Sequence, residues 1–313
     1  MRPYRLLVAL VVLGAGLATL VGCPKPTPPA PAPVTPVAPP KTAAQPPKAP
    51  SPAGEVSGQL TVLVPCGLNG PYGELETLFT KQHSGVTFGP PVLKNITELE
   101  EMATKGTEAD VLLSPGDREV LAVEKAGQTM LGSRIGVALS SLTLLVPAQG
   151  AKVKGWEDLG KEPLPIVGIA DPKTNSCGYY AVEALKKAGF YDKLQKAKRI
   201  VEAPQPSDLG VWIAGKKVDV AINYESCVHE APKGAAPAEP KASPKKAKAA
   251  GPVPAGLYHP FYLTAVVLKG ANNPAAAAAF VQFLVTPEAG AIWEKWSFGK
   301  AEAAVPVAPP TAK

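Results

Sequence analysis

Short apolar runs rich in β-branched residues alternate with amphipathic helical patterns, and this alternation constrains the fold more than any other feature. The strand-like runs span residues 59–64, 109–114, 141–147, 165–171, 218–223 and 262–270. The helical patterns span residues 73–82, 117–127, 179–189 and 273–298. Alternation of this kind predicts an α/β fold with mostly parallel, helix-covered sheets.

The N-terminus has the organisation of an export signal. Arg2 and Arg5 precede an apolar run that leads through Leu-Val-Gly to Cys23. A charged start, an apolar stretch and a small-residue cleavage site predict a signal peptide over residues 1–22. The sequence Leu-Val-Gly-Cys also resembles the lipobox of bacterial lipoproteins, which implies that Cys23 is lipidated and anchors the chain to a membrane of the cell envelope. The alternative is an ordinary signal peptide followed by a chance cysteine.

Three further segments have compositions that cannot bury a core. Residues 23–57 form a Pro-rich tether, residues 230–254 an Ala/Pro/Lys insert that we expect to be disordered, and residues 301–313 a flexible tail. The formal net charge of +6 lies mainly in the leader, the tether and the insert, so the remaining body is close to neutral. This distribution argues against a nucleic-acid partner.

The order of several motifs resembles that of the periplasmic molybdate-binding proteins of ABC transporters. The stretches that carry the resemblance are GLNGPYGELETLF, ADVLLS, DPKTNSCGYYAVEAL and VDVAINYES. The resemblance implies a type II periplasmic binding protein with two lobes, each a mostly parallel sheet covered by helices. Residues 58–137 plus 255–300 would form lobe 1, residues 138–229 would form lobe 2, and a ligand cleft would lie between them.

The same resemblance implies which residues line that cleft. They are Cys66, Gly67, Asn69, Asn95, Ser176, Cys177, Tyr224 and Cys227. Members of the family hold an oxyanion with hydroxyl groups and with backbone N–H groups at helix N-termini, which suit an anion. Three of these positions are cysteines here, and a thiol is only a weak hydrogen-bond donor. The presence of these cysteines therefore argues against molybdate as the bound solute.

If Cys66, Cys177 and Cys227 all face the cleft, lobe closure would bring three sulfur atoms together. Thiolate ligands select thiophilic centres. We therefore expect a solute such as Cu(I), Hg(II), Zn(II) or As(III), with His229 as a fourth ligand for Zn(II). The leading hypothesis is a monomeric, lipid-anchored solute-binding protein that offers this ion to an ABC permease or a membrane sensor.

Two alternatives stay open. In one, the solute is a molybdate, tungstate or sulfate-type oxyanion, and the cysteines are structural. In the other, Cys177 and Cys227 form a disulfide in a thiol-redox or structural envelope protein. The sequence has no phosphate-cradling glycine loop, no G-x-S-x-G elbow and no C-x-x-C pair. We therefore expect neither an enzyme nor a catalytic cofactor.

Overall fold

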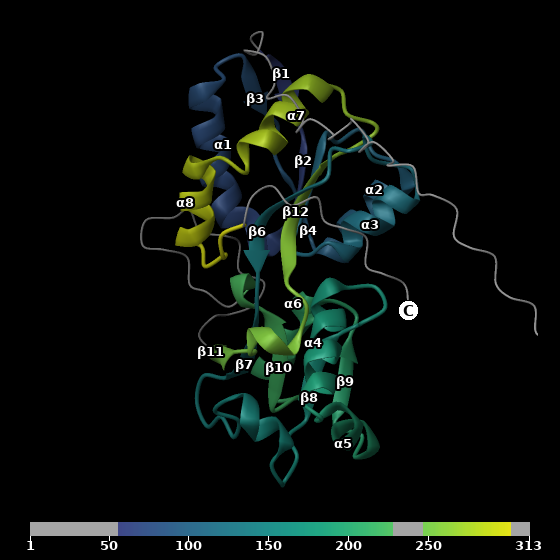
Figure 1. Ribbon diagram of the computed structural model, residues 1–313, viewed down its shortest axis with the longest axis vertical. Coiled ribbons are helices and arrows are strands. Elements are labelled where there is room, and N and C mark those ends of the chain that lie inside the picture. The colour runs from purple at the N-terminus through teal and green to yellow at the C-terminus, as the bar shows by residue number, and fades with distance from the viewer. Residues whose placement is uncertain (1–55, 228–246, 302–313) are drawn as a thin grey trace, which may run out of the picture. The chain divides into compact units, whose positions relative to one another are not determined.

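A computed structural model of the chain describes residues 56–227 and 247–301, which form two five-stranded sheets covered by helices (Figure 1). The spatial order of the first sheet is β4 (Val92–Lys94), β2 (Val62–Pro65), β5 (Val111–Ser114), β12 (Phe261–Val267) and β6 (Ile135–Ser140). Strand β2 runs parallel to β4 and β5, whereas β12 is antiparallel to β5 and β6. A separate parallel pair joins β1 (Gly58–Leu60) to β3 (Val86–Phe88).

Helices cover both faces of the first sheet, and β2 shows the consequence. Its residues Val62 and Val64 lie in one hydrophobic core and Leu63 in another, as the two-residue period of a strand requires. The first core also contains side chains of α1 (Asn69–Gln82), α7 (Pro274–Phe283) and α8 (Pro287–Lys295). The second contains side chains of α2 (Ile96–Lys105) and α3 (Arg118–Lys125).

The second sheet has the order β11 (Ala247–Pro252), β7 (Leu142–Pro147), β10 (Val220–Tyr224), β8 (Val167–Ala170) and β9 (Ile200–Ala203). Strand β8 runs parallel to β9 and β10, while β7 is antiparallel to β10 and β11. Each five-stranded sheet therefore has two parallel and two antiparallel pairings, so the sheets are mixed and not mostly parallel as expected. Its helices are α4 (Ser176–Lys187), α5 (Tyr191–Lys196) and α6 (Pro206–Ala214). Short 3₁₀ turns complete the described chain: η1 (Cys66–Leu68), η2 (Trp156–Gly160), η3 (Glu225–Cys227) and η5 (Ala255–Leu257).

The chain passes between the two sheets a few residues later than expected. Strand β6 stays in the first sheet as far as Ser140, and β7 of the second sheet begins at Leu142. The expected boundary after residue 137 therefore falls inside β6. On the return, Tyr258 belongs to the core of the second lobe, and its hydroxyl accepts a hydrogen bond from the Leu142 backbone N–H at 3.3 Å. Residues 255–258 thus pack with the second lobe, although the sequence placed them in the first.

Strand β11 lies inside the segment 230–254 that we expected to be disordered. It pairs with the outer edge of β7, and the Thr143 hydroxyl donates to the Gly251 carbonyl at 2.9 Å. Its Ala, Lys and Gly residues have low intrinsic strand preference, so the pairing depends on the exposed edge that β7 offers. The insert is therefore partly ordered at its C-terminal end. Residues 228–246 lie outside the described part of the chain.

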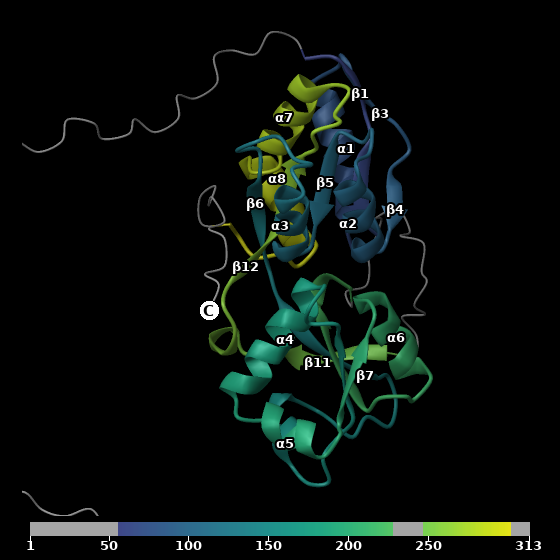
Figure 2. The same cartoon turned by 90° about the vertical axis from the view of Figure 1, so that its right-hand side faces the viewer.

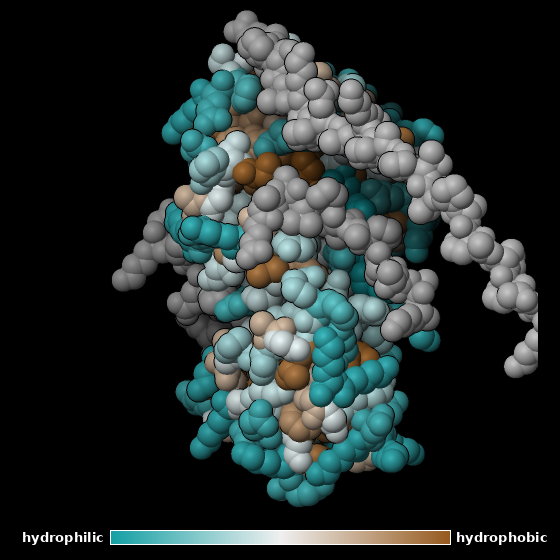
Figure 3. All heavy atoms as spheres, viewed as in Figure 1, coloured by the Kyte–Doolittle hydropathy of each residue, from teal (hydrophilic) through white to brown (hydrophobic). Residues whose placement is uncertain are grey.

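The predicted strands and helices otherwise occur in the expected order. Helix α1 begins at Asn69, four residues before the start indicated by the hydrophobic pattern. No single helix in the described residues is long and apolar enough to cross a membrane, and α7 with α8 reaches that length only with a bend of 65° between them. The face shown in Figure 3 is mainly hydrophilic, with scattered hydrophobic residues.

Candidate functional site

The start of α3 in the first lobe contacts the start of α4 in the second (Figure 2). The backbone N–H of Ser176 donates to Glu119 Oε1 at 2.8 Å, and the Ser176 hydroxyl donates to Glu119 Oε2 at 2.5 Å. The backbone N–H of Arg118 donates in turn to Ser176 Oγ at 3.1 Å. Ser176, one of the predicted site residues, therefore lies where the lobes meet, and its donors hold a carboxylate of the other lobe.

A second set of contacts lies one helical turn further along α4. The Tyr180 hydroxyl donates to the Asp117 carboxylate, with distances of 3.1 Å and 3.3 Å to its two oxygens. The Tyr180 ring stacks on Phe261 with ring centroids 4.2 Å apart. The guanidinium carbon of Arg118 lies 3.9 Å from the centroid of the Tyr179 ring. These contacts hold the start of α3 against α4.

The local sequence explains how α4 packs closely both on β8 of its own lobe and against the first lobe. Asn175 caps the helix by accepting a hydrogen bond from the Cys177 backbone N–H at 2.8 Å, as expected of an N-cap residue. A Cβ on Gly178 would lie 2.1 Å from the Ala170 carbonyl oxygen, so only glycine lets the helix pack this tightly on β8. Likewise, a Cβ on Gly116 would lie 2.3 Å from the Cβ of Ser176.

Tyr224 ends β10 and is 2% exposed. Its hydroxyl oxygen is buried and has no hydrogen-bond partner among the described residues. Burial raises the pKa of this hydroxyl well above its ordinary value, and nearby Glu119, Cys177 and Cys227 raise it further, whereas the approach of the Cys177 backbone N–H to the hydroxyl oxygen opposes the shift. The group therefore stays protonated and lies close to the start of α4. An unsatisfied buried donor is costly, and a ligand that accepts a hydrogen bond from this hydroxyl would relieve that cost.

The three cysteines do not form the predicted set of cleft ligands. Cys177 is 0% exposed and belongs to the core of the second lobe, where its thiol lies 3.6 Å from the Ile222 carbonyl oxygen. Its position in the first turn of α4 turns the side chain towards β10, so the expectation that it faces the cleft is wrong. Burial also raises its thiol pKa.

Cys66 and Cys227 are both exposed and come from turns of different lobes that contact each other. A Cβ on Gly67, another predicted site residue, would lie 3.1 Å from Cys227 Sγ. The pKa of the Cys227 thiol is raised to about 11, chiefly by desolvation of the sulfur and also by nearby Cys66. Part of the Cys227 residue is exposed to solvent, while its sulfur faces Gly67.

Two interpretations of the cysteines are therefore corrected. In residues 56–227 and 247–301, no group of three or more His, Cys, Asp or Glu side chains is arranged to hold a metal ion, so the three-sulfur centre does not form there. Cys177 and Cys227 are free cysteines, so the structure does not contain the alternative disulfide between them. Cys23 and His229, the predicted lipidation site and fourth ligand, lie outside the described residues.

The remaining predicted residues lie away from the start of α4. Asn95 is the N-cap of α2, and its side chain accepts a hydrogen bond from the Glu98 backbone N–H at 2.9 Å. Asn69 lines a surface groove between α1 and Ile292 of α8. Asn95 therefore has a structural role as a helix cap, and neither Ser176 nor Tyr224 lines the groove that contains Asn69.

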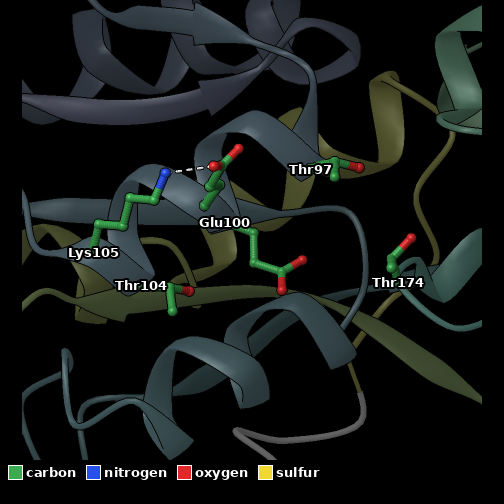
Figure 4. A pocket seen from close by; sticks show the side chains of 6 residues that line it. Thr97, Glu100, Thr104, Lys105 and Thr174 are labelled. Carbon is green, nitrogen blue, oxygen red and sulfur yellow. Dashed lines mark hydrogen bonds and ion pairs between the residues drawn. The ribbon is translucent and has the colours of Figure 1, made fainter.

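A cavity of about 320 Å³ lies between α2 and Thr174, which precedes α4 (Figure 4). On the α2 side, the hydroxyls of Thr97 and Thr104 are buried and have no hydrogen-bond partner among the described residues. Glu100 also lines the cavity, and burial, followed by the charge of Glu119, raises its pKa to about 7. Glu101 and Lys105 also line the cavity and form a solvent-exposed ion pair at 2.5 Å.

Sequence reasoning missed Glu119, although it makes the contacts with Ser176. Glu119 lies in the first turn of α3 on the same helical face as Ala122 and Val123, and only 1% of it is exposed. A carboxylate on the apolar side of a predicted helix was the available signal, because charged residues are rarely buried without a partner. The sequence did not identify its hydrogen-bond partner, Ser176, which lies 57 residues further along the chain.

The chemistry of the junction suits a small acceptor ligand. The start of α4 presents backbone N–H groups and the Ser176 hydroxyl, and the protonated Tyr224 hydroxyl adds a third kind of donor. A helix N-terminus stabilises negative charge through these N–H groups and through the helix dipole. In the structure, the Glu119 carboxylate accepts the hydrogen bonds from the Ser176 N–H and hydroxyl.

Two α/β lobes that meet at a junction lined with such donors define a two-lobed binding protein of the type II periplasmic class. The chain belongs to the family of bacterial extracellular solute-binding proteins, whose family model matches residues 60–299.

Individual relatives support the same assignment. Molybdate-binding protein ModA of Rhodobacter capsulatus is 30% identical over 246 residues, covering 77% of this chain and 88% of that protein. ModA of Azotobacter vinelandii is 26% identical over 250 residues, covering 78% and 90%. The solved structure of the Azotobacter vinelandii periplasmic molybdate-binding protein matches with a TM-score of 0.61 and 22% identity, covering 78% of this chain and 100% of that one. The predicted family and the two-lobed fold class are therefore confirmed.

Proposed function

We propose that this protein captures a small inorganic oxyanion of the molybdate type and delivers it, as a monomer, to an ABC permease. The observation that carries the proposal is the buried Tyr224 hydroxyl, which has no partner among the described residues and lies near the start of α4. The names of the two ModA relatives support the choice of molybdate.

The donors at the junction fit an oxyanion better than a cation. The Ser176 hydroxyl and backbone N–H, together with the Tyr224 hydroxyl, all present hydrogen atoms. Hydrogen bonds to a charged acceptor are about twice as strong as those between neutral groups, so a few such donors hold an anion well. The carboxylates at the junction, Glu119 and Asp117, already accept hydrogen bonds from Ser176 and Tyr180, so a cation would have to compete with these donors.

Capture of a thiophilic ion is the second candidate, and it rests on Cys66 and Cys227 alone. The contact between their turns across the two lobes favours it. The raised pKa of Cys227 weighs against it, because at neutral pH the thiolate that binds Cu(I) or Hg(II) is scarce. The burial of Cys177 removes the third sulfur that the sequence supplied.

An envelope location is part of the same proposal. We place the protein outside the cytoplasm, held to a membrane through lipid on Cys23, because the N-terminal sequence resembles a lipoprotein signal. The family to which the chain belongs is described as extracellular. Metabolic labelling with a radioactive fatty acid tests the anchor, since Cys23→Ala should abolish the label if Cys23 carries the lipid.

Calorimetric titration distinguishes the two candidate classes of solute. Under reducing conditions, the protein should bind molybdate or tungstate with a stoichiometry of one, and binding should persist in the double variant Cys66→Ser/Cys227→Ser. A thiophilic receptor would instead bind Cu(I), Hg(II) or arsenite, and the double variant would lose that binding. Absence of any heat with molybdate, tungstate and sulfate would contradict the oxyanion proposal.

A further inference from the structure

The buried carboxylate of Glu119 occupies the donors that an oxyanion would use at the start of α4. Glu119 Oε1 accepts from the Ser176 backbone N–H, and Oε2 accepts from the Ser176 hydroxyl. The Ser114 hydroxyl approaches Oε2 at 3.4 Å. Glu119 belongs to the first lobe and α4 to the second, so the chain itself provides an anion at the N-terminus of this helix.

No cation balances this carboxylate within residues 56–227 and 247–301, where Glu119 makes no ion pair with a Lys or Arg side chain. Arg118 is the neighbouring cation in sequence, but its guanidinium lies over the Tyr179 ring. The other titratable groups that interact with Glu119 are acids: Asp117 at the start of α3, Glu100 on α2, Cys177 on α4, and Tyr224 on β10.

A second anion placed near the start of α4 would meet Glu119 at short range in a buried setting. Like charges repel strongly when water is excluded, and the usual outcome is that one group takes up a proton. Glu119 is prepared for this, because burial already raises its pKa and Asp117 raises it further, although the hydrogen bonds from Ser176 oppose the shift. Once neutral, the carboxyl group releases the Ser176 donors or donates its own proton to the ligand.

We propose that Glu119 acts as an internal competitor that selects the solute, so that an oxyanion binds beside α4 only together with one proton taken up by Glu119. This inference rests on the proposed oxyanion-binding function. The proton comes from the solvent and neutralises the carboxylate. The net charge of the closed site therefore becomes more negative by one unit less than the charge of the bound oxyanion. Glu119 is therefore a specificity-determining residue that lowers affinity for fully ionised anions as the pH rises.

Calorimetry with sodium molybdate tests this directly, in two buffers of different ionisation enthalpy, between about pH 6 and about pH 8. The wild-type protein should take up close to one proton per anion, and its affinity should fall by up to about tenfold per pH unit. Glu119→Gln keeps the size of the side chain and can still accept from Ser176. At about pH 8 this variant should bind molybdate at least about tenfold more tightly than the wild type does, and it should take up no proton.

Glu100→Gln is the matched control, because Glu100 is a neighbouring acid with a raised pKa that does not contact Ser176. This variant should retain the proton uptake. Uptake that disappears with Glu100→Gln and persists with Glu119→Gln would overturn the inference, as would wild-type binding without proton uptake. If Glu119→Gln does not fold, comparison of the wild type with Glu100→Gln in the same two buffers decides the question: uptake that Glu100→Gln retains supports the inference, and uptake that it loses overturns it.

The same titrations distinguish the inference from the proposed function. Molybdate binding without proton uptake leaves the function standing and overturns the role of Glu119. A lack of binding to every folded variant overturns both proposals.

Discussion

The carboxylate of Glu119 and the hydroxyl of Ser176 lie 2.5 Å apart, although the two residues are separated by 57 positions and belong to different lobes. This hydrogen bond places the start of α3 against the start of α4. It also puts a negative charge at a helix N-terminus, where negative charge is stabilised. The contact thus links closure of the lobes to the electrostatics of the proposed anion site.

Removing the Tyr224 hydroxyl should weaken oxyanion binding without destabilising the protein. We expect Tyr224→Phe to lower affinity for molybdate by roughly tenfold to a hundredfold, because a hydrogen bond to a charged group contributes about 1.5–3 kcal/mol. The free energy of unfolding should stay unchanged or rise slightly, because a buried hydroxyl without a partner is lost. Calorimetry and chemical denaturation measure the two effects. Tyr72→Phe in the core of the first lobe is the matched control and should leave affinity unchanged.

Glu100 should make the free energy of unfolding depend on pH. Its folded-state pKa of about 7 exceeds the ordinary value of 4.5, so between these values the folded protein binds more protons than the unfolded chain. Stability contributed by this group is therefore present below pH 4.5 and lost as the pH rises to about 7. Glu100→Gln should remove this loss and stabilise the protein above that pH by about 1 kcal/mol, after allowance for solvent screening.

Denaturation of the wild type and of Glu100→Gln across this range measures the difference. The exposed Glu98→Gln serves as the control, because Glu98 forms only a solvent-exposed pair with Lys94 at 3.5 Å. Equal pH dependence in all three proteins would show that Glu100 titrates normally.

Alkylation should distinguish the buried cysteine from the two exposed ones. In the native protein, we expect a maleimide to modify Cys66 and Cys227 and to leave Cys177 intact, because Cys177 is enclosed in the core of the second lobe. Modification of Cys227 should accelerate as the pH rises towards about 11, the pKa of its thiol. Peptide mass spectrometry with and without denaturant identifies each site. Rapid native labelling of Cys177 would contradict its placement and reopen the three-sulfur hypothesis.

The close approach of the lobes at Gly116 gives another test. In Gly116→Ala, the new methyl group would lie 2.3 Å from the Cβ of Ser176, so the junction must open slightly. We expect a loss of molybdate affinity of roughly tenfold, on the order of 1.4 kcal/mol, and a larger radius of gyration by small-angle scattering. Gly73→Ala on α1 is the control, because no atom lies within 4 Å of its added Cβ. A Gly116→Ala protein with unchanged affinity and radius would show that this contact is not needed for binding.

The sequence predicted the fold class well, because alternation of strands and helices is a local property. Val62, Leu63 and Val64 already carry the pattern of a strand covered on both faces. Strand β11 was not predicted, because its Ala and Lys residues form a strand only beside the free edge of β7. Pairing of this kind depends on tertiary contact and leaves no pattern in the strand itself.

The candidate site was predicted less well. Ser176 lies at the contact between the lobes, whereas Cys177 was expected in the cleft and lies in the core of the second lobe, as Tyr224 does. The roles of Ser176 and Tyr224 in binding stay predictions. The side chains of adjacent residues at a helix start point in different directions, so neighbouring positions in sequence do not share a surface. Glu119 was missed because its role depends on a partner in the other lobe.

The most direct test of the central claim is an anomalous-scattering map from crystals of the protein grown with tungstate. An anion held at the junction predicts one strong tungsten peak within hydrogen-bonding distance of the Tyr224 hydroxyl and close to the start of α4. A map with no peak there, or with its peak beside Cys66 and Cys227, would contradict the proposed anion site.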